Sequence, residues 1–350
     1  MNDSLPIPDV LRSALAGLLD GLPPSGTASA VDRLISHYRG VVPTHAPVLR
    51  DRSDVAAYAA YRMPATFEAV RSALGAFRDA SGAWTPATHT DIGGGTGAAS
   101  WAVAEAWQDA EAPVATTVLD WAEPALVVGR ELAEASGLPG LRTARWERAR
   151  IGSALTLERA DLVTVSYVLN ELTAEDRRSL VDAAIGAATG AVLIVEPGTP
   201  DGYTRIIEAR DRLIEAGLHI AAPCPHSAAC PIEPGTDWCH FSARVSRSSL
   251  HRQVKGGSLA YEDEKFSYVA ATFPQALKEQ GGDLTTAEPA PARIIRRPQI
   301  RKGQVLLDLC GRDERLRRET VSKRHGPLYR AARDAEWGDP WPPHPADPAS

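Results

Sequence analysis

The stretch THTDIGGGTGAASWAVAEAW, residues 88–107, decides the fold because a short strand-like run passes through clustered glycines into a helical stretch. Gly93, Gly95 and Gly97 let the backbone turn sharply, and their missing side chains let a ligand approach the main chain closely. The stretch therefore predicts a strand, a tight turn and a helix, with the turn available to a ligand.

Strand-like and helical runs continue to alternate after this stretch. Residues 116–121, 161–168 and 191–198 are strand-like, and each run precedes a stretch with apolar residues three and four apart. Strand and helix taking turns at this spacing predicts βαβ units. We therefore expect an α/β fold with a doubly wound parallel sheet.

A nucleoside site is indicated by the residue that ends the second strand-like run. Asp120 stands there, where a carboxylate can accept hydrogen bonds from both ribose hydroxyls of a ligand. The glycines follow the pattern G-x-G-x-G, which differs from the dinucleotide pattern G-x-G-x-x-G and is the form seen in enzymes that use S-adenosylmethionine. We expect S-adenosylmethionine or S-adenosylhomocysteine to be bound by Asp91, Gly93, Gly95, Gly97, Asp120 and Trp121, with Trp121 along the adenine face. The alternative is a tight turn without a ligand.

A methyl acceptor is less well defined by the sequence. Amino-group methylases of nucleic acid place an Asn/Asp-Pro-Pro-aromatic turn after the fourth strand, whereas this chain has Ser-Tyr-Val-Leu at 166–169. Four polar residues fall at the expected carboxyl ends of strands, where they serve either catalysis or helix caps and loop hydrogen bonds: Tyr167, Asn170, Glu171 and Glu196. Cofactor binding is therefore better supported than turnover, and we assign no catalytic residue.

Three of the four cysteines lie within APCPHSAACPIEPGTDWCHF, residues 221–240. With Cys310 they make four thiols, the number that a closed metal site requires: Cys224, Cys230, Cys239 and Cys310. Their spacing contains no C-x₂₋₄-C pair of the zinc type, and the two Cys-Pro steps resemble those of iron–sulfur proteins. A 4Fe-4S cluster is the leading interpretation, zinc with His226 or His240 is the second, and unligated core thiols are the third.

Charge is distributed unevenly along the chain. The net charge is −6, but the segment from Arg293 to Arg333 has thirteen Lys or Arg against four Asp or Glu. Such a segment favours a polyanionic partner, and serines between basic residues after position 240 suit an RNA backbone. The candidate RNA contacts are Arg244, Arg247, Arg252, Lys255, Arg296, Arg297, Arg301, Lys302, Lys323 and Arg324. A solvated face or a device for solubility or membrane-surface contact is the alternative.

The compartment is inferred from what the sequence lacks. It has no apolar run of eighteen residues and no basic stretch ahead of the first apolar residues, so we expect no membrane partner and no secretory signal. These observations predict a cytoplasmic protein, in which clustered thiols serve a metal or chemistry more often than disulfides. We expect a monomer.

The chain resembles the methyltransferase-like small-ribosomal-subunit assembly factors of bacteria and mitochondria. The resemblance spans roughly residues 30–340 and includes AYAAYRMPATFEAV, DIGGGTGAASWA, EPGTPDGY, APCPHSAACP, DWCHFSARV, EDEKFSYV and the late Cys310 followed by SKRHG. It implies a class I methyltransferase fold and a 4Fe-4S cluster held by the four cysteines. It also implies binding to 16S-type rRNA on the pre-ribosomal small subunit. An active rRNA methyltransferase and an iron- or redox-responsive RNA-binding protein are the alternative functions.

These features together divide the chain into five expected parts. They are a helical N-terminal region (1–80), an S-adenosylmethionine-binding core (81–220), a cysteine-rich extension (221–260), remaining core strands ending at the last cluster cysteine (261–310) and a basic tail (311–350).

Overall fold

A computed structural model describes residues 5–20, 31, 52–152, 155–248, 250, 259–279 and 290–343. The chain forms two compact units. The first comprises Met1–Leu74, Thr85–Thr189 and Ala243–Glu264, and the second comprises Gly75–Trp84, Gly190–Ser242 and Lys265–Ser350. In the described part of the chain, no helix is long and apolar enough to cross a membrane.

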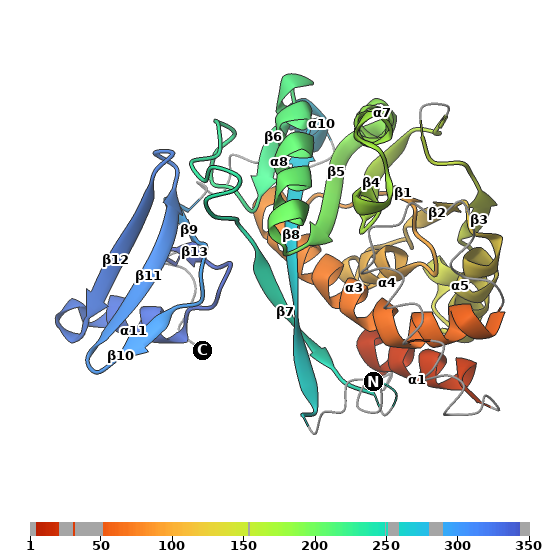
Figure 1. The fold of residues 1–350 in the computed structure, drawn as a ribbon, viewed down its shortest axis with the longest axis horizontal. Coiled ribbons are helices and arrows are strands. Elements are labelled where there is room, and N and C mark those ends of the chain that lie inside the picture. Colours follow the sequence, from red (N-terminus) through yellow and green to blue (C-terminus); the bar gives the residue numbers. More distant parts are fainter. Residues whose placement is uncertain are drawn as a thin grey trace. The chain divides into compact units, whose positions relative to one another are not determined.

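The first unit is built on four parallel strands in the order β3-β2-β1-β4 (Figure 1). They are β1 (Thr88–Ile92), β2 (Ala115–Asp120), β3 (Arg145–Arg148) and β4 (Ala160–Ser166). The helices are α1 (Ile7–Leu18), α4 (Ala98–Ala106), α5 (Glu123–Ala135), α6 (Pro139–Arg142), the 3-10 turn η1 (Leu169–Glu171), α7 (Ala174–Ala187) and most of α3 (Arg52–Ser81). The inner strands β1 and β4 are buried on both faces, and the polar side chains that β1 buries are hydrogen-bonded: His89 Nε2 lies 2.8 Å from Thr164 Oγ1, which donates to Asp91 Oδ1 at 2.9 Å.

The second unit contains β5 (Ala188–Pro197), α8 (Pro200–Glu215), β6 (His219–Ala222), most of β8 (Tyr261–Thr272) and α10 (Pro274–Glu279). Strand β8 runs antiparallel to both β5 and β6, and β7 (Phe241–Ser246) also pairs with it. The large sheet has the order β3-β2-β1-β4-β5-β8-β6. Among the described strands, the parallel set followed by the antiparallel β8 has the order of a Rossmann-like α/β fold.

A second, antiparallel sheet lies in the C-terminal part of the second unit (Figure 1). Its strands are β9 (Ala292–Ile294), β10 (Gln299–Arg301), β11 (Gln304–Gly311), β12 (Leu316–Ser322) and β13 (Pro340–Trp341). The 3-10 turn η2 (Lys323–His325) and helix α11 (Pro327–Asp334) come between β12 and β13 in the chain. Val305, Leu307 and Leu309 bury one face of β11 with Ala332 of α11. Because side chains alternate along a strand, Cys310 faces the opposite side from Leu309.

The structure differs from the sequence-based division at its C-terminal end. The segment 311–350 is not only a basic tail, since β12 and β13 are strands of the second sheet and α11 packs against β11 of that sheet. Strands β9 to β11 also belong to this sheet rather than to the main sheet. Of the helical N-terminal region expected over residues 1–80, residues 1–4, 21–30 and 32–51 lie outside the described residues.

Candidate cofactor and metal-centre sites

The glycine loop, residues 93–97, joins β1 to α4 as the sequence predicts. Gly93, Gly95 and Gly97 all have positive φ, at 68°, 54° and 87°. A side chain at Gly97 would come within 2.7 Å of the Trp146 ring, so that glycine is required for packing. A side chain at Gly95 would meet only Asp120 Oδ2 at 3.8 Å, which leaves open space at this residue. The loop therefore combines a packed side with one open position.

Asp120 ties this loop to the end of β2. Its Oδ2 accepts a hydrogen bond from Gly95 N at 2.9 Å, and its Oδ1 accepts one from Ala122 N at 2.8 Å. Burial raises the pKa of Asp120, and the backbone hydrogen bonds act against that rise. Each carboxylate oxygen retains a lone pair, so the side chain can still accept hydrogen bonds from a ribose. Neighbouring Trp121 is 45% exposed and is free of the core.

Asp91 occupies a different environment from Asp120. It is fully buried and accepts hydrogen bonds from Thr164 Oγ1 at 2.9 Å and Ser100 Oγ at 3.3 Å. Burial raises the pKa of Asp91 to about 6. Asp91 therefore supports the loop through side-chain hydrogen bonds, and its contact with a ligand stays a prediction.

The end of β4 carries an unusual tyrosine. Tyr167 has a φ of 59°, a conformation that bulky residues rarely adopt. Its hydroxyl donates to Glu264 Oε1 at 3.0 Å, and Glu264 forms a paired ion contact with Arg62 at 2.7 and 3.0 Å. The Arg62 guanidinium also lies 4.8 Å from the Tyr167 ring centre. Tyr167 is thus held in a polar network.

The other polar residues at strand ends occupy different settings. Asn170 and Glu171 lie exposed in η1. Glu196 is fully buried, and its Oε2 accepts a hydrogen bond from Arg205 Nε at 2.7 Å. The structure does not assemble these residues into one catalytic group.

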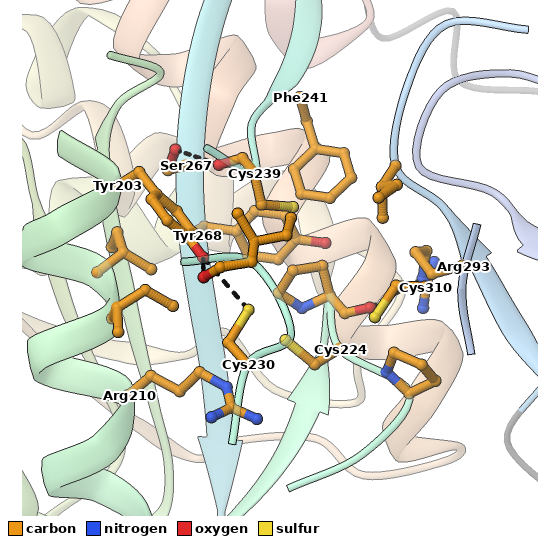
Figure 2. A pocket seen from close by; sticks show the side chains of 16 residues that line it. Tyr203, Arg210, Cys224, Cys230, Cys239, Phe241, Ser267, Tyr268, Arg293 and Cys310 are labelled. Atoms are coloured by element: carbon orange, nitrogen blue, oxygen red, sulfur yellow. Dashed lines mark hydrogen bonds between the residues drawn. The ribbon is translucent and has the colours of Figure 1, made fainter. Parts of the chain in front are cut away.

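The four cysteines line one cavity inside the second unit, which we call the cysteine cavity (Figure 2). Its volume of about 30 Å³ exceeds the space needed by one water molecule. Its walls also include Tyr203 and Arg210 of α8, Tyr268 of β8, and Arg293 and Ile295. The structure therefore brings Cys310 to the three cysteines of residues 221–240.

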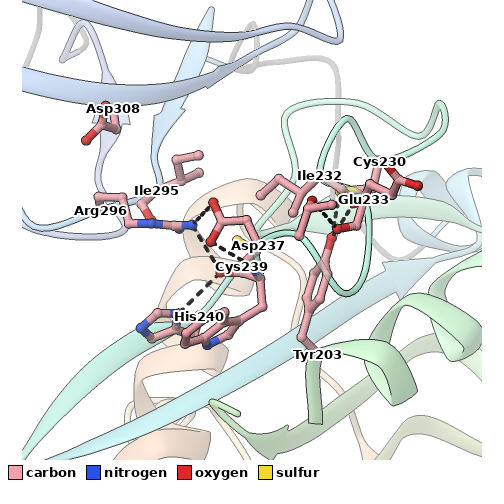
Figure 3. A network of polar contacts seen from close by, with 12 residues as sticks. Tyr203, Cys230, Ile232, Glu233, Asp237, Cys239, His240, Ile295, Arg296 and Asp308 are labelled. Atoms are coloured by element: carbon pink, nitrogen blue, oxygen red, sulfur yellow. Dashed lines mark hydrogen bonds and ion pairs between the residues drawn. The ribbon is translucent and has the colours of Figure 1, made fainter. Parts of the chain in front are cut away.

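Several contacts fix the segments that carry the thiols. Ser267 Oγ donates to Cys239 O at 2.7 Å, and Trp238 Nε1 donates to Gly198 O at 3.1 Å. Arg296 binds Asp237 Oδ2 at 2.6 Å and Trp238 O at 3.1 Å, which joins the second sheet to the cysteine-rich segment (Figure 3). The cavity is thus held from both sides by contacts that do not use the sulfur atoms.

The thiols are electrostatically unfavourable as free thiolates. Burial raises the pKa of Cys224, Cys239 and Cys310, in the last case to about 12, and charge on neighbouring thiolates adds to the rise. All four cysteines are free of disulfides. A metal cation reverses this preference, since a coordinating thiol is deprotonated outright. The donor set therefore suits a cationic centre.

The histidines considered as zinc ligands lie at the margin of this site. His226 Nε2 is 3.7 Å from Cys310 Sγ, and His240 stacks on Trp238 with ring centres 5.3 Å apart. Within the described ranges, no three His, Cys, Asp or Glu side chains have an arrangement suited to a single metal ion. The four cysteines are among the residues that line the same cavity.

The predicted RNA contacts separate into paired and unpaired groups. Arg247 binds Glu262, Arg296 binds Asp237, and the largely exposed Arg244 stacks on Tyr261 at 4.3 Å. Exposed basic side chains gather where the β10–β11 turn meets the end of β12, since Lys323 N donates to Gly303 O at 3.1 Å. This basic end contains Arg301, Lys302, Lys323 and Arg324. Arg297 is also exposed, whereas Arg252 and Lys255 lie outside the described residues.

Sequence reasoning missed three residues of the cavity wall: Tyr203, Arg210 and Arg293. Tyr203 and Arg210 lie seven positions apart on one face of α8, which is the only signal of their shared environment. Nothing in the sequence distinguishes Arg293 from the other arginines of its basic segment.

Comparison with known proteins gives a family and several relatives. Residues 52–342 match the family described as "Mitochondrial small ribosomal subunit Rsm22". The human "Ribosome assembly protein METTL17, mitochondrial" is 28% identical over 301 residues, covering 81% of this chain and 61% of that protein. The fission yeast "Rsm22-cox11 tandem protein 2, mitochondrial" is 31% identical over 185 residues, covering 44% of this chain and 24% of that protein. The chain thus spans less than two thirds of the length of these curated relatives.

Among solved structures, magnesium protoporphyrin IX methyltransferase from Synechocystis, with bound SAM, is 14% identical with a TM-score of 0.39. The match covers 78% of this chain and 99% of the methyltransferase chain. Likeness at this level supports no conclusion about the chain.

The relatives correct one expectation. The sequence predicts a cytoplasmic protein, but the matched relatives are mitochondrial by name, which overturns that assignment.

Proposed function

Because this chain belongs to the mitochondrial small ribosomal subunit Rsm22 family, we propose that it assists assembly of a small ribosomal subunit by binding its rRNA. In this proposal the first unit binds S-adenosylmethionine, and the cysteine cavity holds a structural 4Fe-4S cluster. The observation that carries the proposal is the meeting of four thiols from segments about seventy residues apart around one cavity.

The fit of the metal centre follows from the wall of the cavity. Four buried or half-buried thiols that line one cavity would supply the ligands, and four thiolates are the donor set of a 4Fe-4S cluster. When bound, the centre supplies cross-links between the cysteine-rich segment and β11, whose loop closure otherwise costs entropy. Cys224, Cys230, Cys239 and Cys310 would hold it.

Binding of S-adenosylmethionine is supported by the glycine loop and Asp120. The open position at Gly95 lies beside a carboxylate that is already oriented by two backbone N–H groups. A nucleoside can therefore bind without reorganising this side chain. A matched test is isothermal titration with S-adenosylhomocysteine, comparing Asp120→Ala with Asp161→Ala, which lies in the same sheet.

RNA binding is supported by the basic end of the second sheet. Its four exposed cations form two consecutive pairs, Arg301 with Lys302 and Lys323 with Arg324. Such cations can neutralise phosphates of an RNA backbone without reading its sequence. We expect reversal of Arg301, Lys302, Lys323 and Arg324 to Glu to weaken binding of small-subunit rRNA, and to reduce the salt slope by about three.

The control for this experiment reverses four exposed arginines of the first unit: Arg12, Arg142, Arg150 and Arg159. The proposal predicts a much smaller loss for the control. Equal rRNA affinity and equal salt slope for the two variants would remove the basic end from the interface.

An active rRNA methyltransferase is the competing function. The glycine loop is common to both functions, so donor binding does not separate them. We expect the wild-type protein to bind labelled S-adenosylmethionine without transferring methyl groups to rRNA. Transfer that is abolished by Asp120→Ala would establish the methyltransferase instead. A redox-responsive role requires rRNA affinity to follow reversible oxidation, which the same binding assay measures.

A further inference from the structure

Arg210 is a buried arginine whose charge is poorly compensated by the protein. It is 1% exposed, and its Nη2 donates to Ala228 O at 2.6 Å and His226 O at 3.2 Å. Its Nε and Nη1 have no hydrogen-bond partner among the described residues. The ion pair that it makes is a 3.5 Å contact from Nη1 to Asp211, whose side chain is 57% exposed. A buried cation is costly unless a close anion compensates it.

The missing anion is indicated by the position of the guanidinium. Arg210 lines the cysteine cavity and lies beside Cys224 and Cys230 in Figure 2. The guanidinium nitrogens that lack a hydrogen-bond partner, Nε and Nη1, belong to a side chain of the cavity wall, so a negatively charged group in the cavity could compensate them. Neutral thiols provide no negative charge for Arg210. Four thiolates around a centre of charge +2 carry a net charge of −2, which does.

Tyr203 adds a neutral donor to the same wall. Its Oη lies 3.2 Å from Cys230 Sγ and 3.0 Å from Ile232 O. The hydroxyl has one proton for these two acceptors. A thiolate accepts a hydrogen bond more strongly than a thiol does. Formation of a thiolate at Cys230 thus favours donation toward the sulfur.

We propose that Arg210 is the charge-compensating positioning residue of a dianionic tetrathiolate centre, with Tyr203 as a second donor to its sulfur atoms. This inference rests on the proposed metal centre of the cysteine cavity. It assigns Arg210 a role in metal retention and in reduction of the centre. Both effects follow from charge. Removing the positive charge of Arg210 destabilises the dianionic centre beside it, and it disfavours adding an electron to that centre.

The test compares Arg210→Met, Arg210→Lys and Tyr203→Phe with the control Arg212→Met in protein reconstituted anaerobically with iron and sulfide. Arg212 lies on the same helix, and its side chain is 46% exposed. We expect Arg210→Met to lose iron to a chelator about 10 to 100 times faster than wild type. Its midpoint potential moves to more negative values, Arg210→Lys restores part of both effects, and Arg212→Met behaves as wild type.

The midpoint potential separates charge compensation from a purely structural role. An unchanged potential in Arg210→Met would overturn the inference, as would iron loss equal to that of Arg212→Met. If Arg210→Met does not fold, Arg210→Gln and Tyr203→Phe provide the comparison, and wild-type iron loss and midpoint potential in both variants would overturn the inference. Failure of the wild-type protein to bind any centre would instead overturn the proposed function.

Discussion

The glycine loop of the first unit and the cysteine cavity of the second unit are built in opposite ways. The loop uses main-chain groups from residues close in sequence, and Asp120 already satisfies two of them. The cavity uses side chains from distant segments. It leaves two Arg210 nitrogen atoms without a hydrogen-bond partner among the described residues, and its four cysteines form no disulfide. A loop of the first kind is complete before its ligand binds. A cavity of the second kind depends on its ligand for stability.

Removal of one thiol is the strongest way to test this difference. We expect Cys310→Ala to abolish retention of the metal centre and to lower the free energy of unfolding of the second unit by about 4 kcal/mol. This is the stabilisation that a ligand gives when its free concentration is about a thousand times its Kd. Hydrogen exchange in β11, measured beside the metal content, checks this result. S-adenosylhomocysteine binding by the first unit should not change.

The matched control is Val305→Ala, which lies on the same strand but faces α11. It removes core contacts and should cost about 1–2 kcal/mol while leaving metal content intact. Metal loss in both variants would show that the cavity responds to general loosening of the sheet.

The two regions should also differ in their response to pH. Burial lowers the pKa of His89 in β1 to about 3, so the unfolded chain takes up a proton first as pH falls below 6.5. His89 therefore contributes stability above pH 6.5 that is lost toward pH 3. Asp91, whose pKa burial raises to about 6, contributes stability that is lost as pH rises from 3.8 through 6. The His89 effect is isolated by comparing wild type with His89→Gln.

The metal-free cavity should respond at the opposite end of the scale. The pKa of Cys310 is raised to about 12, so its contribution is complete below pH 9 and is lost as pH rises toward 12. Urea unfolding of metal-free protein measures both limbs. An alkaline loss that persists in Cys310→Ala would contradict the assignment to this thiol.

Asp120→Asn should have a smaller and more local effect. The amide cannot reproduce both accepted hydrogen bonds, so we expect a loss of about 1–3 kcal/mol in the first unit and at least tenfold weaker S-adenosylhomocysteine binding. Calorimetric titration measures the affinity. Metal content should equal that of wild type, and a parallel loss of metal would contradict independence of the two sites.

The smallest effect is expected at Gly95. Alanine there meets no atom closer than 3.8 Å, so Gly95→Ala should cost only the backbone strain of a positive φ, about 1 kcal/mol. Gly97→Ala should cost more because its side chain approaches Trp146 at 2.7 Å. Thermal unfolding of the two variants checks the order, and the reverse order would show that the loop is packed differently.

The sequence predicts the main sheet well because its signals are local. Strands β1, β2, β4 and β5 are each predicted as a short strand-like run that is followed by a periodic helix, and the structure has all of them. The second sheet was missed because β9 and β10 contain three residues each and are stabilised by pairing with the distant β11. Local periodicity does not report such pairing.

The candidate sites were predictable to different extents. The number of thiols predicts that the four cysteines meet, and the structure brings them to one cavity. Asp91 and Asp120 look alike in sequence and are both buried, and only the structure shows that Asp91 accepts from side-chain hydroxyls whereas Asp120 accepts from backbone N–H groups of the loop and of Ala122. The burial of Arg210 could not be predicted, because an arginine on an amphipathic helix is expected to face solvent unless its neighbours are known. The predicted cytoplasmic location was wrong because amino-acid composition does not encode the compartment.

The central claim is that the four sulfurs of the cysteine cavity bind one inorganic centre. The most direct measurement is the iron and acid-labile sulfide content of protein purified without oxygen, together with its visible absorption. We predict a brown protein with about four irons and four sulfides per chain, and none in Cys310→Ala. A colourless wild-type protein without iron and sulfide would contradict the account.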